Sequence, residues 1–336
     1  MLNDRYNKAR QFIHEWIFPN HLFIIYCLVL LSLVWSVAYG IVWQDRHTVL
    51  QDVIHNNNQL THAFEEHVRR NLHHVDENLQ TIKFDFEREQ QVTPFIQRYY
   101  ARLAEDPLLN QSILLDKDKK VLASALPVKP GTQFIDLPHY EYHRTADRWE
   151  LFVGKQFIGR VSGKSSIHLS RRLNSTDGSF AGVVIAAIDP LFFTRFYQDM
   201  ELPPETVVRV VGLDGWVRAS RDPDEPKVSP NLRTVGVLFK HQEQSKNGHY
   251  TSIGALTGKI RYFSYRSMPD FPLIVQVGVD SELALAPHRT RRNLTYGVAS
   301  FVSLLVLGST FGMLVLTRRR RISEQRHQLL FKTISS

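Results

Sequence analysis

The stretch from Val161 to Pro190 reads VSGKSSIHLSRRLNSTDGSFAGVVIAAIDP and predicts a β-hairpin that leads into a helix. Its first strand, Lys164 to Leu173, alternates polar and apolar side chains, which is typical of a strand with one exposed face. An Asp-Gly turn between Asn174 and Gly178 separates it from a wholly apolar strand, Phe180 to Ile188. A half-exposed strand beside a buried one indicates an antiparallel sheet.

Segments around this hairpin occur twice in the chain. LLDKDKKVLAS (Leu114 to Ser124) aligns without gaps with VVGLDGWVRAS (Val210 to Ser220), and each reads as strand, polar turn, strand. FAGVVIAAID (Phe180 to Asp189) and FPLIVQVGVD (Phe271 to Asp280) share Phe, Val and a terminal Asp at identical spacing. We therefore expect an α+β fold built from two tandem copies of one module.

A long helix is predicted ahead of the two modules, because no proline or glycine occurs between Gln44 and about Gln91. Six apolar residues in it follow alternating spacings of four and three: Val68, Leu72, Val75, Leu79, Ile82 and Phe86. This stripe predicts either a contact between the helices of a dimer or packing of the helix on its own domain, and the sequence leaves both open.

Two uncharged segments, Leu22 to Val42 and Leu294 to Leu316, each reach the roughly 20 residues that a helix needs to span a bilayer. The first also contains a small-x-small triplet, but its apolar run exceeds the roughly 7 to 15 residues of a signal-peptide core. We therefore expect both segments to be transmembrane helices, so that the chain crosses its partner, a lipid bilayer, twice.

The net charge of +8 reflects orientation in the membrane rather than nucleic-acid binding. Nine basic and three acidic residues lie in the two tails, which accounts for six of the eight charges. The positive-inside rule then places both tails in the cytoplasm and the long middle segment outside. The single cysteine, Cys27, lies in the first span, so neither an intrachain disulfide nor a cysteine-ligated metal is expected in the outer domain.

The order of these parts resembles the double Cache (tandem PAS-like) sensor region of bacterial transmembrane signalling proteins. The sequences LFVGKQFIGRVSGKSSIHLSRRLNSTDGSFAGVVIAAIDPLFFTRFY, VVRVVGLDGWVRASR and IRYFSYRSMPDFPLIVQVGVD are similar to the sensor regions of membrane diguanylate cyclases and related histidine kinases. The resemblance implies a receptor of the bacterial inner membrane with a periplasmic sensor, and we expect it to work as a parallel homodimer through its long helix and both spans. Its membrane-distal module would bind a small molecule and its membrane-proximal module would relay the signal.

The apolar segments, the long helix and the repeat together give the expected boundaries. These are a cytoplasmic tail (1–21), a span (22–42), a stalk helix (43–92), a membrane-distal module (93–200), a membrane-proximal module (201–293), a second span (294–316) and a cytoplasmic helix (317–336). The segment after Arg321, ISEQRHQLLFKTISS, has neither a GGDEF signature nor a phosphoacceptor histidine box. We therefore expect no enzymatic activity in this chain and an output domain, of cyclase or kinase type, that is missing from it or carried by a partner.

The strongest candidate site lies on the first strand of the hairpin. Lys164, Ser166 and His168 alternate with apolar residues and so share one face of that strand. If a helix from Asp136 to Asp147 covers this face, a polar or anionic ligand would meet them there. The expected ligand-binding residues are Tyr140, His143, Trp149, Lys164, Ser166, His168, Arg171 and Asp189.

Several alternatives remain open at this site. The strand face could be solvated, and Asp189 could cap the helix that begins at Pro190 instead of binding a ligand amine. Amino-acid-sensing relatives carry an Arg-x-Trp-Tyr element that Arg148-Trp149-Glu150 keeps only in part, so that ligand class is not carried over.

Other classes of function have weaker support in the sequence. His139 and His143 have a metal-competent spacing, but no third ligand is evident, so we expect neither metal nor cofactor. A periplasmic enzyme would need a nucleophile motif such as Gly-x-Ser-x-Gly, and the sequence contains no such motif. An envelope scaffold would use the same two spans without binding a ligand.

Overall fold

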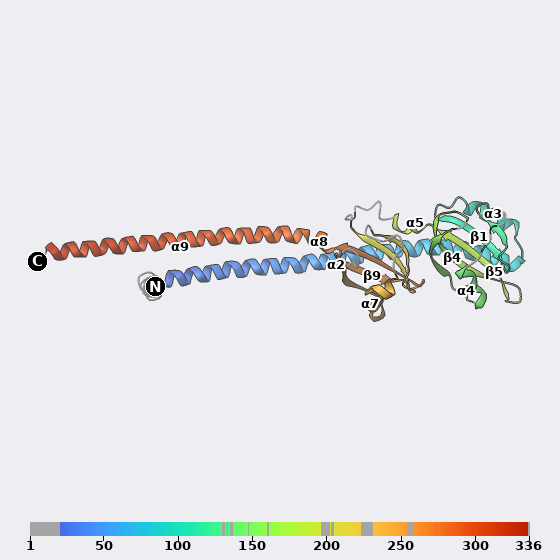
Figure 1. Cartoon of the computed structure of the whole chain (residues 1–336), viewed down its shortest axis with the longest axis horizontal. Coiled ribbons are helices and arrows are strands. Elements are labelled where there is room, and N and C mark those ends of the chain that lie inside the picture. The colour runs from blue at the N-terminus through green and yellow to red at the C-terminus, as the bar shows by residue number, and fades with distance from the viewer. Residues whose placement is uncertain are drawn as a thin grey trace, which may run out of the picture. The chain divides into compact units, whose positions relative to one another are not determined.

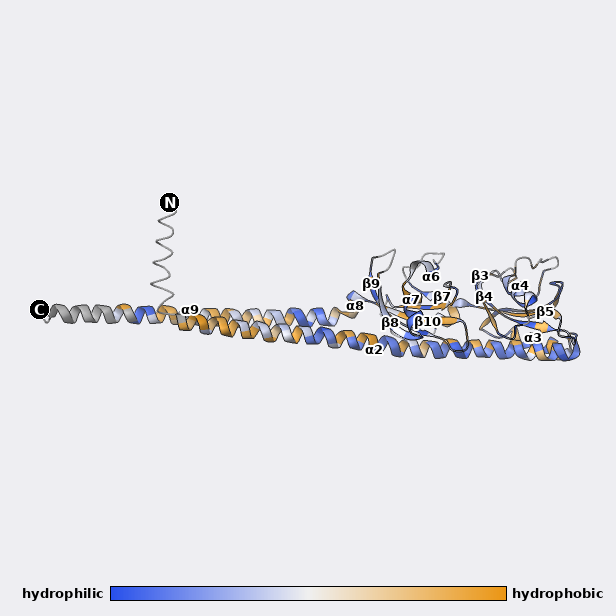
Figure 2. Cartoon of the chain, turned by 90° about the horizontal axis from the view of Figure 1, so that it is seen from below, coloured by the Kyte–Doolittle hydropathy of each residue, from blue (hydrophilic) through white to orange (hydrophobic). Residues whose placement is uncertain are grey.

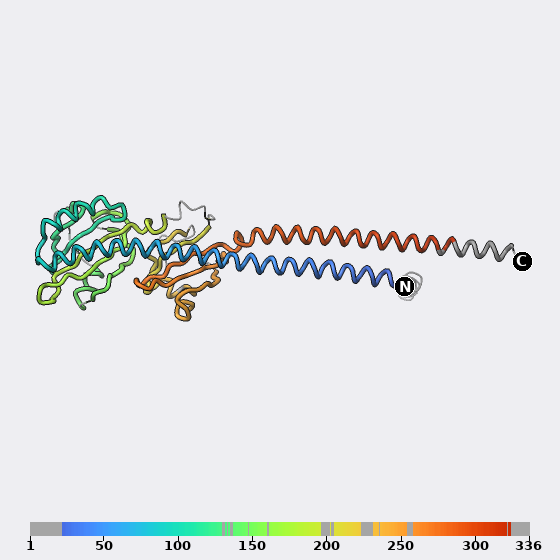
Figure 3. The backbone as a smooth tube through the Cα atoms, turned by 180° about the vertical axis from the view of Figure 1, so that it is seen from behind, coloured from blue at the N-terminus to red at the C-terminus, as the bar shows by residue number. Residues whose placement is uncertain are grey.

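The computed structural model describes residues 21–334 except 130–131, 133, 135–136, 147, 160, 196–201, 203–204, 223–230 and 254–257. The chain divides into two compact units. The central unit comprises residues 52–284, and the terminal unit comprises the segments before residue 52 and after residue 284. Helix α2 (His21–Glu89) is continuous, so the expected first span and stalk helix form one helix, which Figure 3 shows as an unbroken tube.

Two antiparallel five-stranded sheets form the central unit and confirm the α+β duplication (Figure 1). The first sheet has the order β2-β1-β5-β4-β3 and the second has the order β7-β6-β10-β9-β8. The strands of the first are β1 (Leu109–Asp116), β2 (Val121–Ser124), β3 (Phe152–Ile158), β4 (Ser165–Asn174) and β5 (Phe180–Ile188). Those of the second are β6 (Val207–Gly212), β7 (Val217–Arg221), β8 (Asn247–Ile253), β9 (Ile260–Ser267) and β10 (Leu273–Asp280).

The predicted hairpin is confirmed as β4 and β5, with β5 in the centre of its sheet. The polar turn ends at Gly178, which adopts a φ of 82° that a residue with a Cβ rarely takes. Gly182 in β5 has a φ of 151°, and a Cβ there would lie 2.1 Å from the carbonyl oxygen of Leu115. The neighbouring strand β1 therefore packs against β5 closely only because residue 182 is glycine.

The apolar stripe of α2 packs on the sheets of its own chain. Val68, Leu72, Val75, Leu79, Ile82 and Phe86 are 0% to 5% exposed and share one hydrophobic core with strands of both modules. This confirms the second of the two expectations for the stripe. It also means that these six residues are not free to form a dimer contact, because their side chains are already buried.

Shorter helices complete the two modules. Helix α3 (Pro94–Leu103) begins at Thr93, whose hydroxyl oxygen accepts a hydrogen bond from the N–H of Ile96. Helix α4 (Pro138–Thr145) packs on β4 and β5, and α7 (Leu238–Gln244), preceded by α6 (Leu232–Val235), packs on β8. Helix α5 (Pro190–Arg195) leaves the first module and packs on β7 of the second, and α8 (Ser281–Ala284) follows β10.

The terminal unit consists of the first part of α2 and of α9 (Ala286–Ile334). Each contains a window that is long and apolar enough to cross a membrane, as the colours of Figure 2 show. Few residues of either window are buried. The rings of Trp35 and Tyr296 lie 6.0 Å apart, and Asp45 pairs with His288 and Arg291. The hydrogen bonds from Arg291 and His288 lower the pKa of Asp45 below its ordinary value.

Candidate ligand-binding pocket

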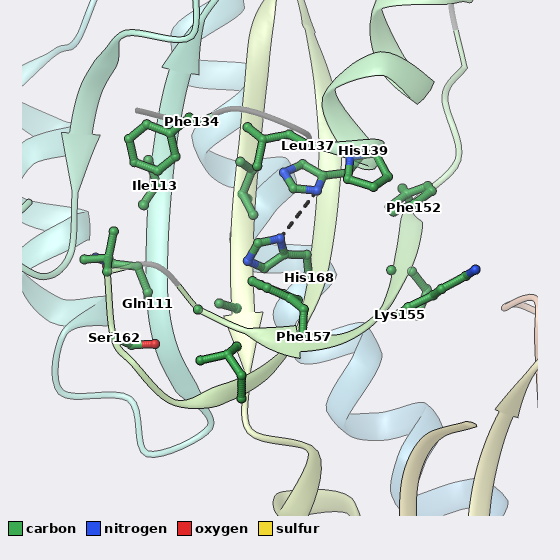
Figure 4. Close-up of a pocket in the computed structure, with 18 of the residues that line it drawn as sticks. Gln111, Ile113, Phe134, Leu137, His139, Phe152, Lys155, Phe157, Ser162 and His168 are labelled. Carbon is green, nitrogen blue, oxygen red and sulfur yellow. Dashed lines mark hydrogen bonds between the residues drawn. The ribbon is translucent and has the colours of Figure 1, made fainter. Parts of the chain in front are cut away.

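A pocket of about 540 Å³ lies on the face of the first sheet that points away from α2 (Figure 4). Its volume is in the range typical of small-molecule sites. The floor comes from β1, β4 and β5, and the sides come from β3 and the start of α4. Most of the described lining is apolar, including Ile113, Phe134, Leu137, Phe152, Phe157 and Ile185. The site therefore fits a ligand with a largely apolar body.

A bulge in β3 shapes one side of the pocket. The pairing of β3 with β4 shifts between Val153 and Gln156, so that Gly154 and Lys155 together lie opposite one residue of β4, His168, and β3 contains one extra residue. Both line the pocket, and a Cβ at Gly154 would lie only 3.1 Å from the carbonyl oxygen of His168. The equivalent pairing of β8 with β9 has no such shift. Bulges of this kind bend a strand and are common beside functional sites.

Two histidines, the buried His139 and the half-buried His168, contribute to the polar part of the pocket wall. The Nδ1 atoms of His139 and His168 are 3.4 Å apart, and the two rings meet edge to face with centroids 4.7 Å apart (Figure 4). Burial lowers the pKa of His139 to about 3 and that of His168 well below its ordinary value, so both are neutral at neutral pH. Nε2 of His139 has no hydrogen-bond partner among the described residues, so it can bond to a ligand.

The second module fills the corresponding space with its own side chains. In the first sheet His168 is paired with Ala187, and in the second Phe263 is paired with Gly278 at the equivalent position. The Phe263 ring lies so close to Gly278 that a Cβ there would be 2.3 Å from it. The ring of Tyr250 stacks on Phe263 at 5.2 Å. One copy of the duplicated module is therefore open and the other is packed with aromatic rings.

Of the eight residues expected to bind the ligand, His168 lines the pocket, whereas the other seven are not among its described lining residues. Arg171 lies on the opposite face of β4, because successive side chains of a strand alternate. Its guanidinium Nε and Nη2 donate to the two carboxylate oxygens of Asp76 on α2, at 2.5 and 2.8 Å. Trp149 is 63% exposed, and its carbonyl oxygen accepts a hydrogen bond from Arg171.

Tyr140, His143 and Ser166 are buried close to the pocket but bond within the protein. The hydroxyl of Tyr140 donates to the carbonyl oxygen of Lys117. Nε2 of His143 lies 3.1 Å from both the carbonyl oxygen and the hydroxyl of Ser170, and burial lowers the pKa of His143 to about 4. The amide of Asn110 donates to the hydroxyl of Ser166 at 3.0 Å.

Lys164 and Asp189 lie at the two ends of the hairpin. Lys164 is exposed. Asp189 accepts a hydrogen bond from the N–H of Leu191 at 2.9 Å and pairs with Arg195, so the capping expectation for Asp189 is confirmed. The expected covering helix is α4, although Asp136 and Asp147, the limits given for it from the sequence, lie outside the described residues.

Sequence patterns did not indicate two parts of the lining: the second-module residues Asp214 and Arg218, and the β3 wall, which contributes Phe152, Val153, Gly154, Lys155, Phe157 and Ile158. The extra residue in β3 becomes visible only once the pairing of the strands is known. Within the described part of the chain, no group of three His, Cys, Asp or Glu side chains is placed to hold a metal ion.

No family model and no curated protein matches the chain. Among solved structures, it is 26% identical to the extracellular domain of rpHK1S-Z16, described as a histidine kinase, over 68% of this chain and 95% of that domain, with a TM-score of 0.62. The periplasmic sensory domain of the Campylobacter jejuni chemoreceptor Tlp1 is 12% identical, with coverage of 71% and 99% and a TM-score of 0.60.

The ligand-binding domain of the Pseudomonas fluorescens chemoreceptor CtaA, solved with L-leucine, is 14% identical, with coverage of 71% and 99% and a TM-score of 0.53. All three matches extend over nearly the whole of the matched domain, and therefore over both modules together. The chain has the tandem PAS-like, double Cache fold of the extracytoplasmic sensory domains found in histidine kinases and chemoreceptors.

Proposed function

We propose that this chain is a membrane-anchored receptor that binds a small molecule in the pocket of its first, membrane-distal module. The observation that carries this proposal is the difference between the two copies of the module. One copy keeps a cavity of about 540 Å³ and the other fills the same place with Phe263 and Tyr250. An envelope scaffold, the alternative class, has no use for such a cavity.

The chemistry of the lining supports a ligand with an apolar body and few polar groups. The neutral pair of His139 and His168 offers hydrogen bonds but no charge. L-Leucine is the ligand in the CtaA structure, and its amine requires an anionic partner. The one carboxylate among the described lining residues is Asp214, which already pairs with Arg218. This favours ligands without an ammonium group.

The remaining parts of the proposal concern assembly and output. Two apolar helices and basic tails support a two-pass protein of the bacterial inner membrane with both termini in the cytoplasm. The signal would pass through α9 to a cytoplasmic diguanylate cyclase or histidine kinase domain, or to a partner protein. A homodimer would use the exposed face of α2 and the two spans, because the apolar stripe is buried.

Two neighbouring alanines of β5 provide a matched test of the pocket. Ala187 lines the pocket, whereas Ala186 faces the core shared with α2. Ala187→Leu places a side chain in empty space, so we expect the variant to keep its stability and lose ligand binding. Ala186→Leu overpacks a filled core and should destabilise the protein by about 1 to 3 kcal/mol.

Thermal-shift measurements on the full chain in detergent micelles, with a panel of metabolites that includes L-leucine and small carboxylic acids, would read both effects. A compound that raises the Tm of the wild type and of Ala186→Leu, but not that of Ala187→Leu, supports the receptor. A panel in which no compound raises the wild-type Tm, or in which Ala187→Leu responds like the wild type, contradicts the proposed pocket.

A further inference from the structure

Arg218 extends from the second module to the pocket of the first. It lies on β7, is 5% exposed, and is one of the described residues that line the cavity. Its Nη2 is 3.4 Å from the carbonyl oxygen of Val153, a pocket residue in the bulged strand β3. Beside it, Nζ of Lys155 lies 4.5 Å from the centre of the Trp216 ring. The β6–β7 turn therefore closes one end of the cavity.

The guanidinium of Arg218 is held in a fixed place. Nη1 donates to the carbonyl oxygen of Trp216 at 2.9 Å. The carboxylate of Asp214 pairs with Nη1 at 3.0 Å and accepts a hydrogen bond from Nη2 at 3.1 Å. The group packs against Gly212, where a Cβ would lie 2.5 Å from Nη2. A glycine at position 212 is thus required for this arrangement of the arginine.

The internal duplication shows that this arrangement belongs to one copy only. In the aligned turn of the first module, Leu122 stands in the place of Arg218 and Asp116 in the place of Gly212. There the Asp116 carboxylate itself accepts hydrogen bonds from the N–H groups of the turn. The arginine and the glycine beneath it therefore occur together in the copy whose turn faces the pocket.

Arg218 has donor capacity to spare. Its Nε is buried and has no hydrogen-bond partner among the described residues. A guanidinium carries five N–H donors in a planar fork that matches a carboxylate. Asp214, its present partner, has a side chain that is 42% exposed, so water competes for that pair. An acceptor that arrives through the largely apolar cavity would meet a cation with less competition from solvent.

We propose that Arg218 receives a carboxylate of the ligand, so that the natural ligand is a small apolar carboxylic acid held by both modules at once. The apolar wall of the first module takes the hydrocarbon part, and Lys155 adds a second positive charge at the same end. A bound ligand would then strengthen the contact between β3 and β7. Through this contact, the second module would respond to ligand binding in the first. The inference rests on the proposed receptor function and adds the ligand class and the residue that recognises it.

Matched pairs of acid and amide test this inference, because they differ mainly in charge. We would titrate the full chain in nanodiscs calorimetrically with phenylacetate, phenylacetamide, isovalerate and isovaleramide. The wild type should bind each acid more tightly than its amide by roughly tenfold or more, as expected for a charge-assisted hydrogen bond. Arg218→Gln should remove this preference, mainly by weakening the binding of the acids.

Asp214→Asn should change the affinity for the acids in the opposite direction. The asparagine oxygen can still accept from the N–H of Trp216, as the Asp214 carboxylate does at 3.2 Å, but it no longer neutralises Arg218. Acid binding should therefore tighten by several-fold, whereas an arginine with only a structural role would give no gain. Arg233→Gln removes a cation from the neighbouring helix α6, outside the described lining, and should preserve the preference for acids.

The outcomes separate this inference from the proposed function. Equal binding of acids and amides by the wild type, or a preference for acids that survives in Arg218→Gln, overturns the role of Arg218. If neither acid binds and some other compound raises the Tm in a manner that depends on Ala187, the receptor function stands and the carboxylate inference fails. If no compound raises the Tm in a manner that depends on Ala187, both the receptor function and the carboxylate inference fail.

Discussion

At the scale of single residues, three histidines of the first module are neutral, and of these His139 and His143 are buried and His168 is half-buried. His139 and His168 face the pocket, and His143 bonds to Ser170 on the same side of the sheet. Burial is the largest cause of the lowered pKa in all three cases. In the unfolded chain, each histidine would titrate near its ordinary pKa of about 6.5.

This predicts a loss of stability in mild acid. Between about pH 6.5 and the lowered native pKa values, the unfolded chain binds more protons than the folded chain, so the free energy of unfolding falls as the pH falls. Each histidine should contribute roughly 1 kcal/mol per pH unit in this window. We expect the Tm to drop between pH 7 and pH 5, and to drop less in His168→Phe, which copies Phe263 of the second module. Equal drops in the two proteins would contradict the assignment.

At the scale of elements, α2 joins both sheets in the same way. Asp76 binds Arg171 of β4, and Glu65 binds Arg266 of β9, which occupies the equivalent position in the second copy. The two acids are eleven residues apart, about three helical turns, and therefore lie on one face of α2. The repeat is thus present in the contacts to the helix as well as in the strand order.

Removal of one partner from the first of these ion pairs should destabilise the protein strongly. The side chains of Arg171 and Asp76 are 8% and 10% exposed, so Asp76→Ala leaves a buried charge without its partner and should cost about 3 to 5 kcal/mol. The double variant Asp76→Leu with Arg171→Met should recover most of this loss, because it removes both charges. Urea denaturation of the full chain measures both changes.

Glu65→Ala is the matched control for this prediction. Its partner Arg266 has a side chain that is 23% exposed, so water can solvate the remaining guanidinium in part. We therefore expect a smaller loss than for Asp76→Ala. Equal losses at the two positions would show that burial does not set the cost.

At the scale of the whole molecule, the proposed arrangement is a two-pass protein with the central unit outside and both tails inside. Two exposed positions test it in a Cys27→Ser background. Glu243→Cys, in α7, should react with a membrane-impermeant maleimide in intact cells. Ser323→Cys, beyond the second apolar segment, should react only after the inner membrane is permeabilised. Labelling of both cysteines in intact cells would contradict the orientation.

The proposed homodimer can be tested on the exposed face of α2. Arg70 and Glu77 are exposed and one heptad apart, whereas Leu72 and Leu79 are buried in the core of their own chain. In the same Cys27→Ser background, Arg70→Cys and Glu77→Cys should form disulfides between chains, and Leu72→Cys and Leu79→Cys should not. The reverse pattern would mean that the apolar stripe joins two chains instead of packing on the sheets.

The sequence by itself determined the elements and their duplication. The hairpin of β4 and β5, the long helix and the two copies of the strand order follow from local periodicity, turn residues and internal similarity. These patterns reflect which side chains of a segment face water and which face the core. They can therefore be interpreted without knowledge of the segments that pack beside it. The shared face of Ser166 and His168 was predictable for the same reason.

Only the tertiary structure decided which copy holds a pocket and which side chains reach it. The alternation in β4 separates Arg171 from His168 by face, but it does not say that α2 covers one face and α4 the other. The bulge of β3 exists only relative to its partner strand, and Arg218 joins the site across the contact of two modules. Contacts between residues far apart in the chain depend on strand register and packing, and a local sequence pattern does not specify either of these.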